Sequence, residues 1–130
     1  MAKARLLCLD VIGGTGFKKV ECEELQDFYD ALKCNCFDIT TRNVGGKIFD
    51  IFVDDVGLFA ENPIPSAFDS NLKPALVGNL VFANHDSEGN TVSLSDEDIS
   101  HIENLGFTAI DYDADPIRVW TAIQKVDYRV

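Results

Sequence analysis

The residues of this chain that could act as nucleophiles, bases or metal ligands are few and scattered. Its two histidines, His85 and His101, form no His-Glu-x-x-His arrangement, and the sequence contains no Gly-x-Ser-x-Gly elbow. His85 falls at the edge of a predicted hairpin loop, and His101 falls on a predicted helix. We interpret both as surface residues. With no catalytic residue to name, we expect a protein that binds something and is not an enzyme, although triads also assemble from residues distant in sequence.

Metal-binding patterns are weak as well. The four cysteines include one Cys-x-Cys pair but no pair of knuckles typical of zinc sites, so we interpret them as small, reduced, buried residues: Cys8, Cys22, Cys34 and Cys36. Residues 111–115 begin like a calcium loop, but Pro116 and Ala122 stand where that loop needs Gly and Glu. Asp54 and Asp55 are better explained by a turn than by a metal site. We therefore expect no metal and no cofactor.

Four residues are candidates for ligand binding. Phe82 and Asn84 fall on one face of a predicted strand, where a ring and an amide could stack on and hydrogen-bond a nucleobase. Phe82 is equally well explained as a core residue. Arg118 falls in the first turn of a helix predicted after Asp115-Pro116, where it either holds a phosphate or pairs with nearby aspartates. Arg42 is the second candidate cation, with a surface salt bridge as its alternative.

Charge narrows the search for a partner. Twenty-two acidic residues against eleven basic ones give a net charge of −11. This balance disfavours nonspecific binding to nucleic acid or to an anionic membrane. It is compatible with an acidic surface that imitates nucleic acid for a basic partner. An anionic ligand has only four arginines and seven lysines to bind to.

Size and composition predict one domain over residues 1–130. Hydrophobic residues make up 46% of the chain, enough for a core, and no stretch is long and apolar enough to span a membrane. The N-terminal residues lack the apolar segment and cleavage site of a signal peptide. We therefore expect a cytoplasmic protein.

The hydrophobic pattern predicts an α+β fold, a mainly antiparallel meandering sheet with two to three packed helices. Alternation predicts strands, with turns at 13–16, 45–46, 54–57 and 86–90 and a loop at 62–66; the expected strands are 5–12, 17–22, 37–40, 49–53 and 75–83. The last of these is expected to be central, with Gly78 marking the close approach of another backbone.

Helical spacing appears in three segments. Residues 23–33 carry an apolar stripe, and residues 95–106 start with a Ser95 cap and stop at Gly106. The third helix is expected to start at Asp115-Pro116, with inward-facing apolar positions at Val119, Trp120 and Ile123.

Several of these segments resemble a shared pattern of small phage-encoded proteins. The matching segments read CFDITTR (36–42), VGGKIFD (44–50), DDVGLF (54–59), GNLVF (78–82) and SLSDED (93–98), and the resemblance covers about residues 20–105. The family it resembles is the first family of Thoeris anti-defence proteins. Val56 stands where the pattern carries an acid.

The resemblance implies an oligomeric sponge that sequesters, without degrading it, a cyclic ADP-ribose isomer or a cyclic oligonucleotide used as an immune signal. In that family a strand Phe and arginines nearer the C-terminus hold the ligand, which here implies Phe82 and Arg118. A small domain has little spare interior, so we expect a homo-oligomer, a dimer or higher, with pockets between subunits. Two alternatives remain: an acidic inhibitor that binds a defence protein, and a small hydrolase of a nucleotide signal.

Overall fold

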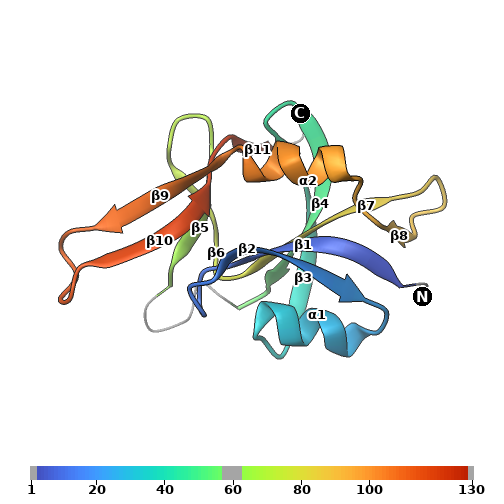
Figure 1. Cartoon of the computed structure of the whole chain (residues 1–130), viewed down its shortest axis with the longest axis horizontal. Helices are drawn as coiled ribbons and strands as arrows, with labels where there is room; N and C mark the ends of the chain where they lie inside the picture. Colours follow the sequence, from blue (N-terminus) through green and yellow to red (C-terminus); the bar gives the residue numbers. More distant parts are fainter. Residues whose placement is uncertain (1–2, 57–62, 129–130) are drawn as a thin grey trace.

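A computed structural model describes residues 3–56 and 63–128, which form eleven strands and two helices in two sheets (Figure 1). The predicted α+β class is confirmed. The strands are β1 (Ala4–Asp10), β2 (Gly16–Cys22), β3 (Phe37–Val44), β4 (Lys47–Asp54), β5 (Pro65–Phe68), β6 (Pro74–Val77), β7 (Leu80–His85), β8 (Thr91–Val92), β9 (Gly106–Asp111), β10 (Arg118–Ile123) and β11 (Val126–Tyr128). The helices are α1 (Leu25–Leu32) and α2 (Asp96–Glu103).

The first sheet has the order β11-β3-β4-β7-β1-β2, with β8 paired to the far end of β7. Its pairings are antiparallel, and the β3–β4 and β1–β2 hairpins have the turns predicted at 45–46 and 13–16. Strand β7 is central, as predicted, because it pairs with both β1 and β4. Its alternate residues therefore enter two different cores.

One core lies on each face of this sheet. Leu7, Leu9 and Val11 share a face, as predicted, and pack with Phe82 against α2 and the base of the second sheet. The opposite face packs against α1, through Phe28 and other aromatic residues. The two helices thus cover opposite faces of the first sheet (Figure 1).

Helix α1 begins with a capping box between Glu24 and Asp27 and ends at Lys33, which adopts a left-handed conformation. Leu25, predicted to be part of its apolar stripe, is the first residue of the helix and is 63% exposed, whereas Phe28 and Leu32 of the stripe are buried. In α2, the Ser95 side chain accepts a hydrogen bond from the Asp98 N–H, which confirms the predicted cap.

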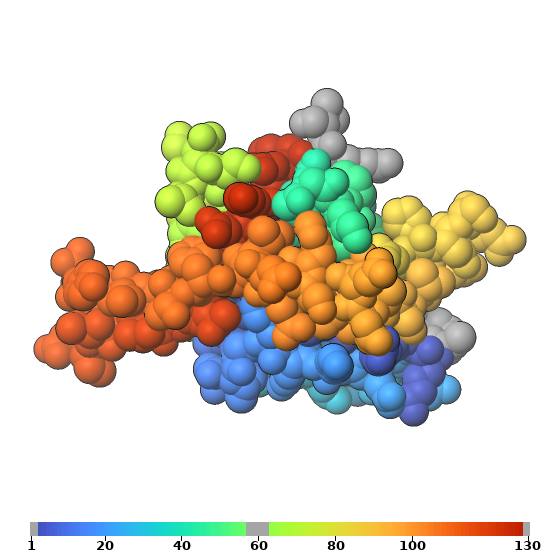
Figure 2. Space-filling view, turned by 45° about the horizontal axis from the view of Figure 1, so that its top comes forward, coloured from blue at the N-terminus to red at the C-terminus, as the bar shows by residue number. Residues whose placement is uncertain are grey.

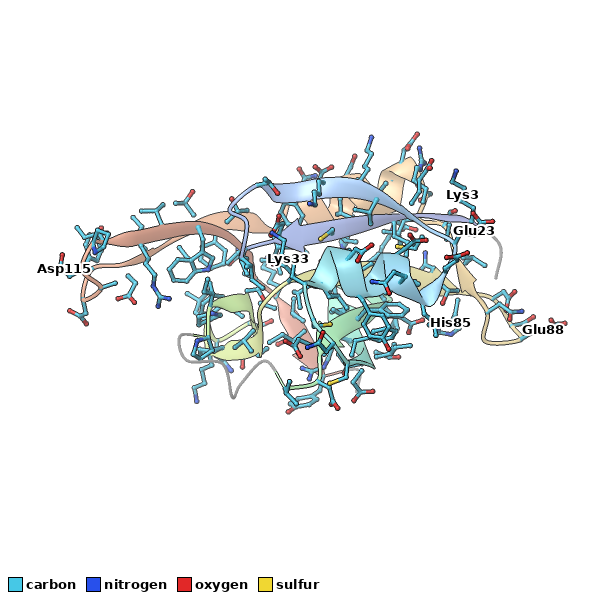
Figure 3. The ribbon with its side chains drawn as sticks, turned by 90° about the horizontal axis from the view of Figure 1, so that it is seen from below. Lys3, Glu23, Lys33, His85, Glu88 and Asp115 are labelled. Atoms are coloured by element: carbon cyan, nitrogen blue, oxygen red, sulfur yellow. The ribbon has the colours of Figure 1, made fainter. Side chains whose placement is uncertain are left out.

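The second sheet has the order β6-β5-β10-β9. Strands β9 and β10 form a hairpin that projects from the rest of the molecule, and its tip near Asp115 lies at the opposite end from the β7–β8 loop at Glu88 (Figures 1 and 3). The prediction of a helix after Asp115-Pro116 is wrong, because this segment forms β10. Residues 118–123 pair one by one with β9, and Val119, Thr121 and Ile123 are β-branched residues at alternating positions, which favours a strand.

Two further predictions need correction. The run predicted as one strand over 75–83 is two strands, β6 and β7, which belong to different sheets. Gly78 separates them with a φ of 75°, and a Cβ there would meet nothing within 4 Å, so positive φ and not a close backbone approach requires the glycine. The loop predicted at 62–66 includes Pro65, which instead begins β5; Asn62, like Gly57 of the predicted turn, lies outside the described residues.

Candidate functional site

A cleft of about 240 Å3 lies between the β3–β11 side of the first sheet and the turn that joins β5 to β6. It is built by one chain from segments far apart in the sequence, which meet because β11 returns to pair with β3. The lining residues are two cations, two acids, one aromatic residue and three apolar residues: Arg42, Lys73, Asp69, Asp127, Tyr128, Pro74, Ala75 and Val126.

Arg42 and Tyr128 are direct partners in the β3–β11 register, so their side chains lie on the same face of the sheet. The Arg42 guanidinium carbon lies 4.6 Å from the centroid of the Tyr128 ring, which is within cation–π range. Arg42 Nε donates a hydrogen bond to Thr40 Oγ1 at 3.0 Å. Its other N–H groups have no protein partner in residues 3–56 and 63–128, so they are available to an anion.

Lys73 is the second cation of the cleft. It is exposed, and it forms no ion pair with any residue that the structure describes. Six of the ten described lysines and arginines are paired with a carboxylate: Lys3, Arg5, Lys18, Lys33, Lys47 and Arg118. Two of the remaining four, Arg42 and Lys73, line the same cleft.

The two acids of the cleft hold its wall in place. Asp69 Oδ1 accepts hydrogen bonds from the backbone N–H groups of Asn71 and Lys73, at 2.8 and 3.0 Å. Asp127 Oδ1 accepts from the Ser70 N–H at 2.9 Å, and its other oxygen accepts from the Ser70 hydroxyl. These bonds from Ser70 lower the pKa of Asp127 below its usual range. They also fasten the β5–β6 turn to β11, which fixes the position of Lys73.

A second cavity of about 180 Å3 adjoins this cleft and shares Ala75 with it. Three carboxylates, Asp38, Asp54 and Asp55, line it together with apolar residues of β4 and β6. Asp54 Oδ1 accepts a hydrogen bond from the Val56 N–H at 3.0 Å, in agreement with the predicted turn. We call the two adjoining cavities the groove. One end holds Arg42 and Lys73 together with Asp69 and Asp127, and the other end holds only carboxylates.

The structure places Phe82 in the core, with no exposed surface. It packs among Leu7, Ile51 and other apolar side chains on the α2 side of the sheet, so its ring has no open face on which a base could stack. The core interpretation left open by the sequence is the correct one. Asn84 follows on the same face, and its amide donates to Asp98 Oδ2 of α2 at 3.0 Å.

Arg118 lies at the start of β10 and not in the first turn of a helix. Its guanidinium donates to Asp111 Oδ2 at 3.0 Å and lies 5.7 Å from the centroid of the Trp120 ring, so the predicted pairing with a nearby aspartate is confirmed. The hydrogen bond from Arg118 lowers the pKa of Asp111. The structure does not bring Arg118 together with Arg42, and the open hollow around Arg118 contains three acids, Asp111, Asp113 and Asp115.

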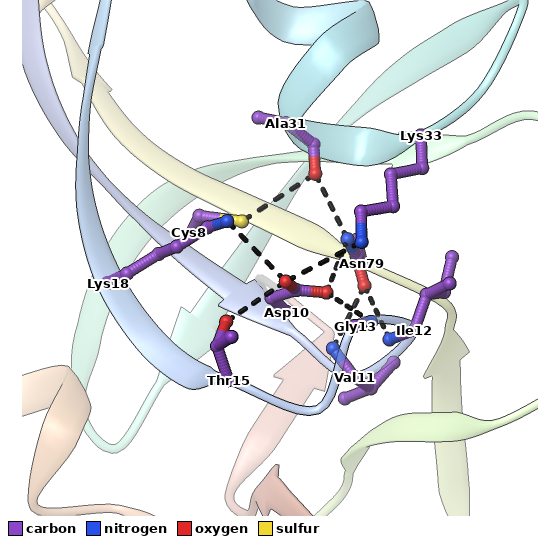
Figure 4. A network of polar contacts seen from close by, with 10 residues as sticks. All are labelled: Cys8, Asp10, Val11, Ile12, Gly13, Thr15, Lys18, Ala31, Lys33 and Asn79. Carbon is purple, nitrogen blue, oxygen red and sulfur yellow. Dashed lines mark hydrogen bonds and ion pairs between the residues drawn. The ribbon is translucent and has the colours of Figure 1, made fainter.

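A buried polar network at the end of β1 was not predicted (Figure 4). Asp10 is 2% exposed and accepts hydrogen bonds from the Gly13 N–H, the Thr15 hydroxyl and the Asn79 amide, at 2.7, 2.9 and 3.0 Å. Lys18 and Lys33 lie 3.4 and 3.8 Å from Asp10 Oδ2. Burial raises the pKa of Asp10, but the hydrogen bonds outweigh it and hold the value at about 2.

Asn79 completes this network. Its side-chain oxygen accepts from the N–H groups of Val11 and Ile12, and its amide also donates to the Ala31 carbonyl of α1. Asn79 thus ties β1, α1 and the start of β7 together. Because each of its polar groups is already bonded, we interpret the network as structural. Two features of the sequence could have indicated this network: Asp10 is the one acid in an apolar strand, and Asn79 is the one amide in an apolar run.

The histidines and cysteines have mainly structural contacts. His85 Nδ1 lies 2.7 Å from Asp50 Oδ2, and His101 Nε2 lies 2.7 Å from the Val44 carbonyl. Cys8 and Cys22 are buried, as predicted, and burial raises the pKa of each thiol to about 11; Cys36, by contrast, is exposed. Within the described ranges no three His, Cys, Asp or Glu side chains are grouped so that they could hold a metal ion.

Comparison with models of protein families gives a match over most of the chain. Residues 8–106 match a protein family described as a domain of unknown function, DUF3846. The chain belongs to this family. The matched range contains Arg42, Lys73, Asp10 and Asn79, and it ends before Arg118 and Tyr128.

No curated protein and no solved structure matches the chain. Neither described helix has the length and apolar character needed to cross a membrane.

Proposed function

We propose that this protein binds a small phosphorylated ligand of the nucleotide class in the groove between its two sheets and holds it without degrading it. One observation carries the proposal. Arg42 and Lys73, which have no carboxylate partner among the described residues, line one cleft beside the exposed ring of Tyr128. In a chain of net charge −11, these two cations are a favourable place for a phosphate, because the acids of the same cleft, Asp69 and Asp127, already accept hydrogen bonds from the β5–β6 turn.

The chemistry of the groove matches the parts of a nucleotide. A guanidinium binds phosphate through two parallel hydrogen bonds, and an aromatic ring stacks on a base. Carboxylates, such as those of Asp38, Asp54 and Asp55 at the far end, accept hydrogen bonds from ribose hydroxyl groups. The combined size of the two cavities reaches the lower part of the range of about 300–1,000 Å3 that small-molecule sites occupy.

Within this class we propose the ligand that the sequence resemblance implies, a cyclic ADP-ribose isomer or a cyclic oligonucleotide used as an immune signal. The protein would then act as an anti-defence sponge, in the cytoplasm of an infected bacterium. The site proposed here keeps Arg42 of the predicted site and replaces Phe82, Asn84 and Arg118 with Lys73 and Tyr128. The two alternative functions, an acidic inhibitor that binds a defence protein and a small hydrolase of a nucleotide signal, remain predictions.

Calorimetric titration tests this proposal. The ligands are isomers of cyclic ADP-ribose, a cyclic dinucleotide, ADP and inorganic phosphate, at physiological ionic strength. We expect a nucleotide to bind more tightly than inorganic phosphate, because only a nucleotide uses the ring of Tyr128 and the acidic end of the groove. Chromatography after heat denaturation of the complex should return the ligand unchanged. No binding of any nucleotide, or recovery of a hydrolysed product, would overturn the proposal.

A further inference from the structure

The outer strand of the projecting hairpin is an open sheet edge. In the part of the chain that the structure describes, β9 pairs with β10 on one side and with no strand on the other. Its sequence, Gly-Phe-Thr-Ala-Ile-Asp over 106–111, contains no proline and no lysine, and its single charge, Asp111, comes at the end. An edge of this kind exposes unpaired backbone N–H and C=O groups and is a template for another strand.

The other sheet edges carry protective features that β9 lacks. Strand β2 has Lys18, Lys19 and Glu21 along its edge. Strand β6 has four residues and begins with Pro74, β11 has three residues, and β8 has two residues. Charges, proline and short length all prevent pairing between edges. The unprotected edge is therefore confined to β9.

The side chains on this hairpin point to the same conclusion. Ile110 and Val119 are direct cross-strand partners, and they are 44% and 61% exposed. Tyr112 and Ile117 continue this exposed apolar surface towards the tip. An exposed apolar patch beside an open edge is typical of an interaction site. Figure 2 shows the hairpin standing clear of the rest of the molecule, so a partner strand could reach it.

We propose that β9 pairs antiparallel with β9 of a second copy of this chain, across a two-fold axis that passes close to Ala109, to give one continuous eight-stranded sheet. An antiparallel edge is complementary to itself under two-fold symmetry. An axis anywhere between Thr108 and Ile110 keeps the two Asp111 carboxylates away from each other. It also brings Ile110 of each copy close to the same face of the other strand, which extends the apolar patch.

The dimer should be weak and salt-dependent. A single strand pair buries an area at the low end of specific interfaces, roughly 1,200 Å2 or less in total. Each chain carries a net charge of −11, so the two copies repel each other over the range that salt screens. We therefore expect a dimer that dissociates on dilution and becomes more stable as the salt concentration rises. This inference is independent of the proposed ligand.

Sedimentation equilibrium over a range of concentrations tests this pairing. The parent protein should shift from 14.4 kDa towards twice that mass as concentration rises. Ile110→Glu should sediment as a monomer at each concentration, whereas the control Ile39→Glu, an equally exposed position on β3, should behave like the parent. A parent protein that stays monomeric throughout, or a folded Ile110→Glu variant that still dimerises, would overturn the proposal.

A second variant covers the case in which Ile110→Glu does not fold. Thr108→Cys, in a Cys36→Ser background, should give a covalent dimer with a short bifunctional maleimide, because Thr108 is exposed and lies one residue from the proposed axis in each copy. Lys19→Cys on the edge of β2 is the matched control and should stay monomeric. Equal cross-linking of the two cysteine variants would mean random collision and would also overturn the proposal.

Discussion

The guanidinium of Arg42 lies 4.6 Å from the centre of the Tyr128 ring, and the two residues are direct partners across β3 and β11. Eighty-six positions apart in the sequence, they meet because the last strand returns to the edge of the first sheet. The turn that carries Lys73 is fastened to the same strand through Ser70 and Asp127. This small framework sets a cationic, aromatic surface at the junction of the two sheets.

Phe82→Ala should destabilise the protein without changing ligand affinity. The side chain is fully buried at the centre of the first sheet, so its loss leaves a cavity that costs about 3–5 kcal/mol of unfolding free energy. Urea denaturation measures the stability, and calorimetry on the folded fraction measures the affinity. If the variant keeps parental stability and loses affinity, the aromatic ring contacts ligand after all.

Sequence reasoning predicted β1, β2, β3, β4 and β7 of the first sheet, where local signals agree, but it did not predict β11. Alternating apolar residues and the Gly45-Gly46 turn identify β3 and β4, and the Ser95 cap identifies α2. The C-terminal hairpin was missed for a physical reason. Residues 118–123 form a strand through pairing with β9, and pairing between strands is a tertiary property that a helix-like spacing of Val119, Trp120 and Ile123 conceals.

The proposed site was only partly predictable from sequence. Arg42 was a candidate because cations are scarce, but its partner Tyr128 and the neighbouring Lys73 come from other segments, and no local pattern links them. The role of Asn79 was missed because its local sequence predicted something else. Asn79 lies in an apolar run that was predicted to be one strand, but Gly78 and Asn79 together break this run into β6 and β7.

Arg118→Ala should leave ligand affinity unchanged. Arg118 is already paired with Asp111, whereas Arg42 and Lys73 have no carboxylate partner among the described residues, so Arg118 offers less attraction to a phosphate. The ion pair is partly exposed, so its loss should change the free energy of unfolding little. Calorimetry and thermal denaturation check the two expectations. Loss of binding in this variant would show that the ligand binds at the β9–β10 hairpin and not in the groove.

Acidification should lower the free energy of unfolding, because Asp10 becomes protonated. Its pKa is about 2 in the folded protein, below the usual value of about 3.9 in unfolded chains, so ionised Asp10 stabilises the fold above pH 4. That contribution is lost as the pH falls from about 4 to 2, and a shift of this size corresponds to roughly 2–3 kcal/mol. Urea denaturation across this range should show a shallower fall for Asp10→Asn than for the parent.

Glu88→Gln is the matched control for this pH experiment, because Glu88 is an exposed carboxylate in the β7–β8 loop. It should keep the parental pH dependence. If Asp10→Asn instead loses stability in parallel with the parent between pH 4 and 2, other carboxylates, and not Asp10, cause the acid sensitivity.

The groove is tested most directly by calorimetric titration of the parent, Arg42→Ala and Lys19→Ala with the tightest-binding nucleotide of the panel. Lys19 is the matched control because it is exposed, forms no ion pair among the described residues and does not line the groove. A charged hydrogen bond contributes about 1.5–3 kcal/mol, so Arg42→Ala should bind roughly ten- to a hundredfold more weakly. Lys19→Ala should bind like the parent. Equal affinity of all three proteins would contradict the account.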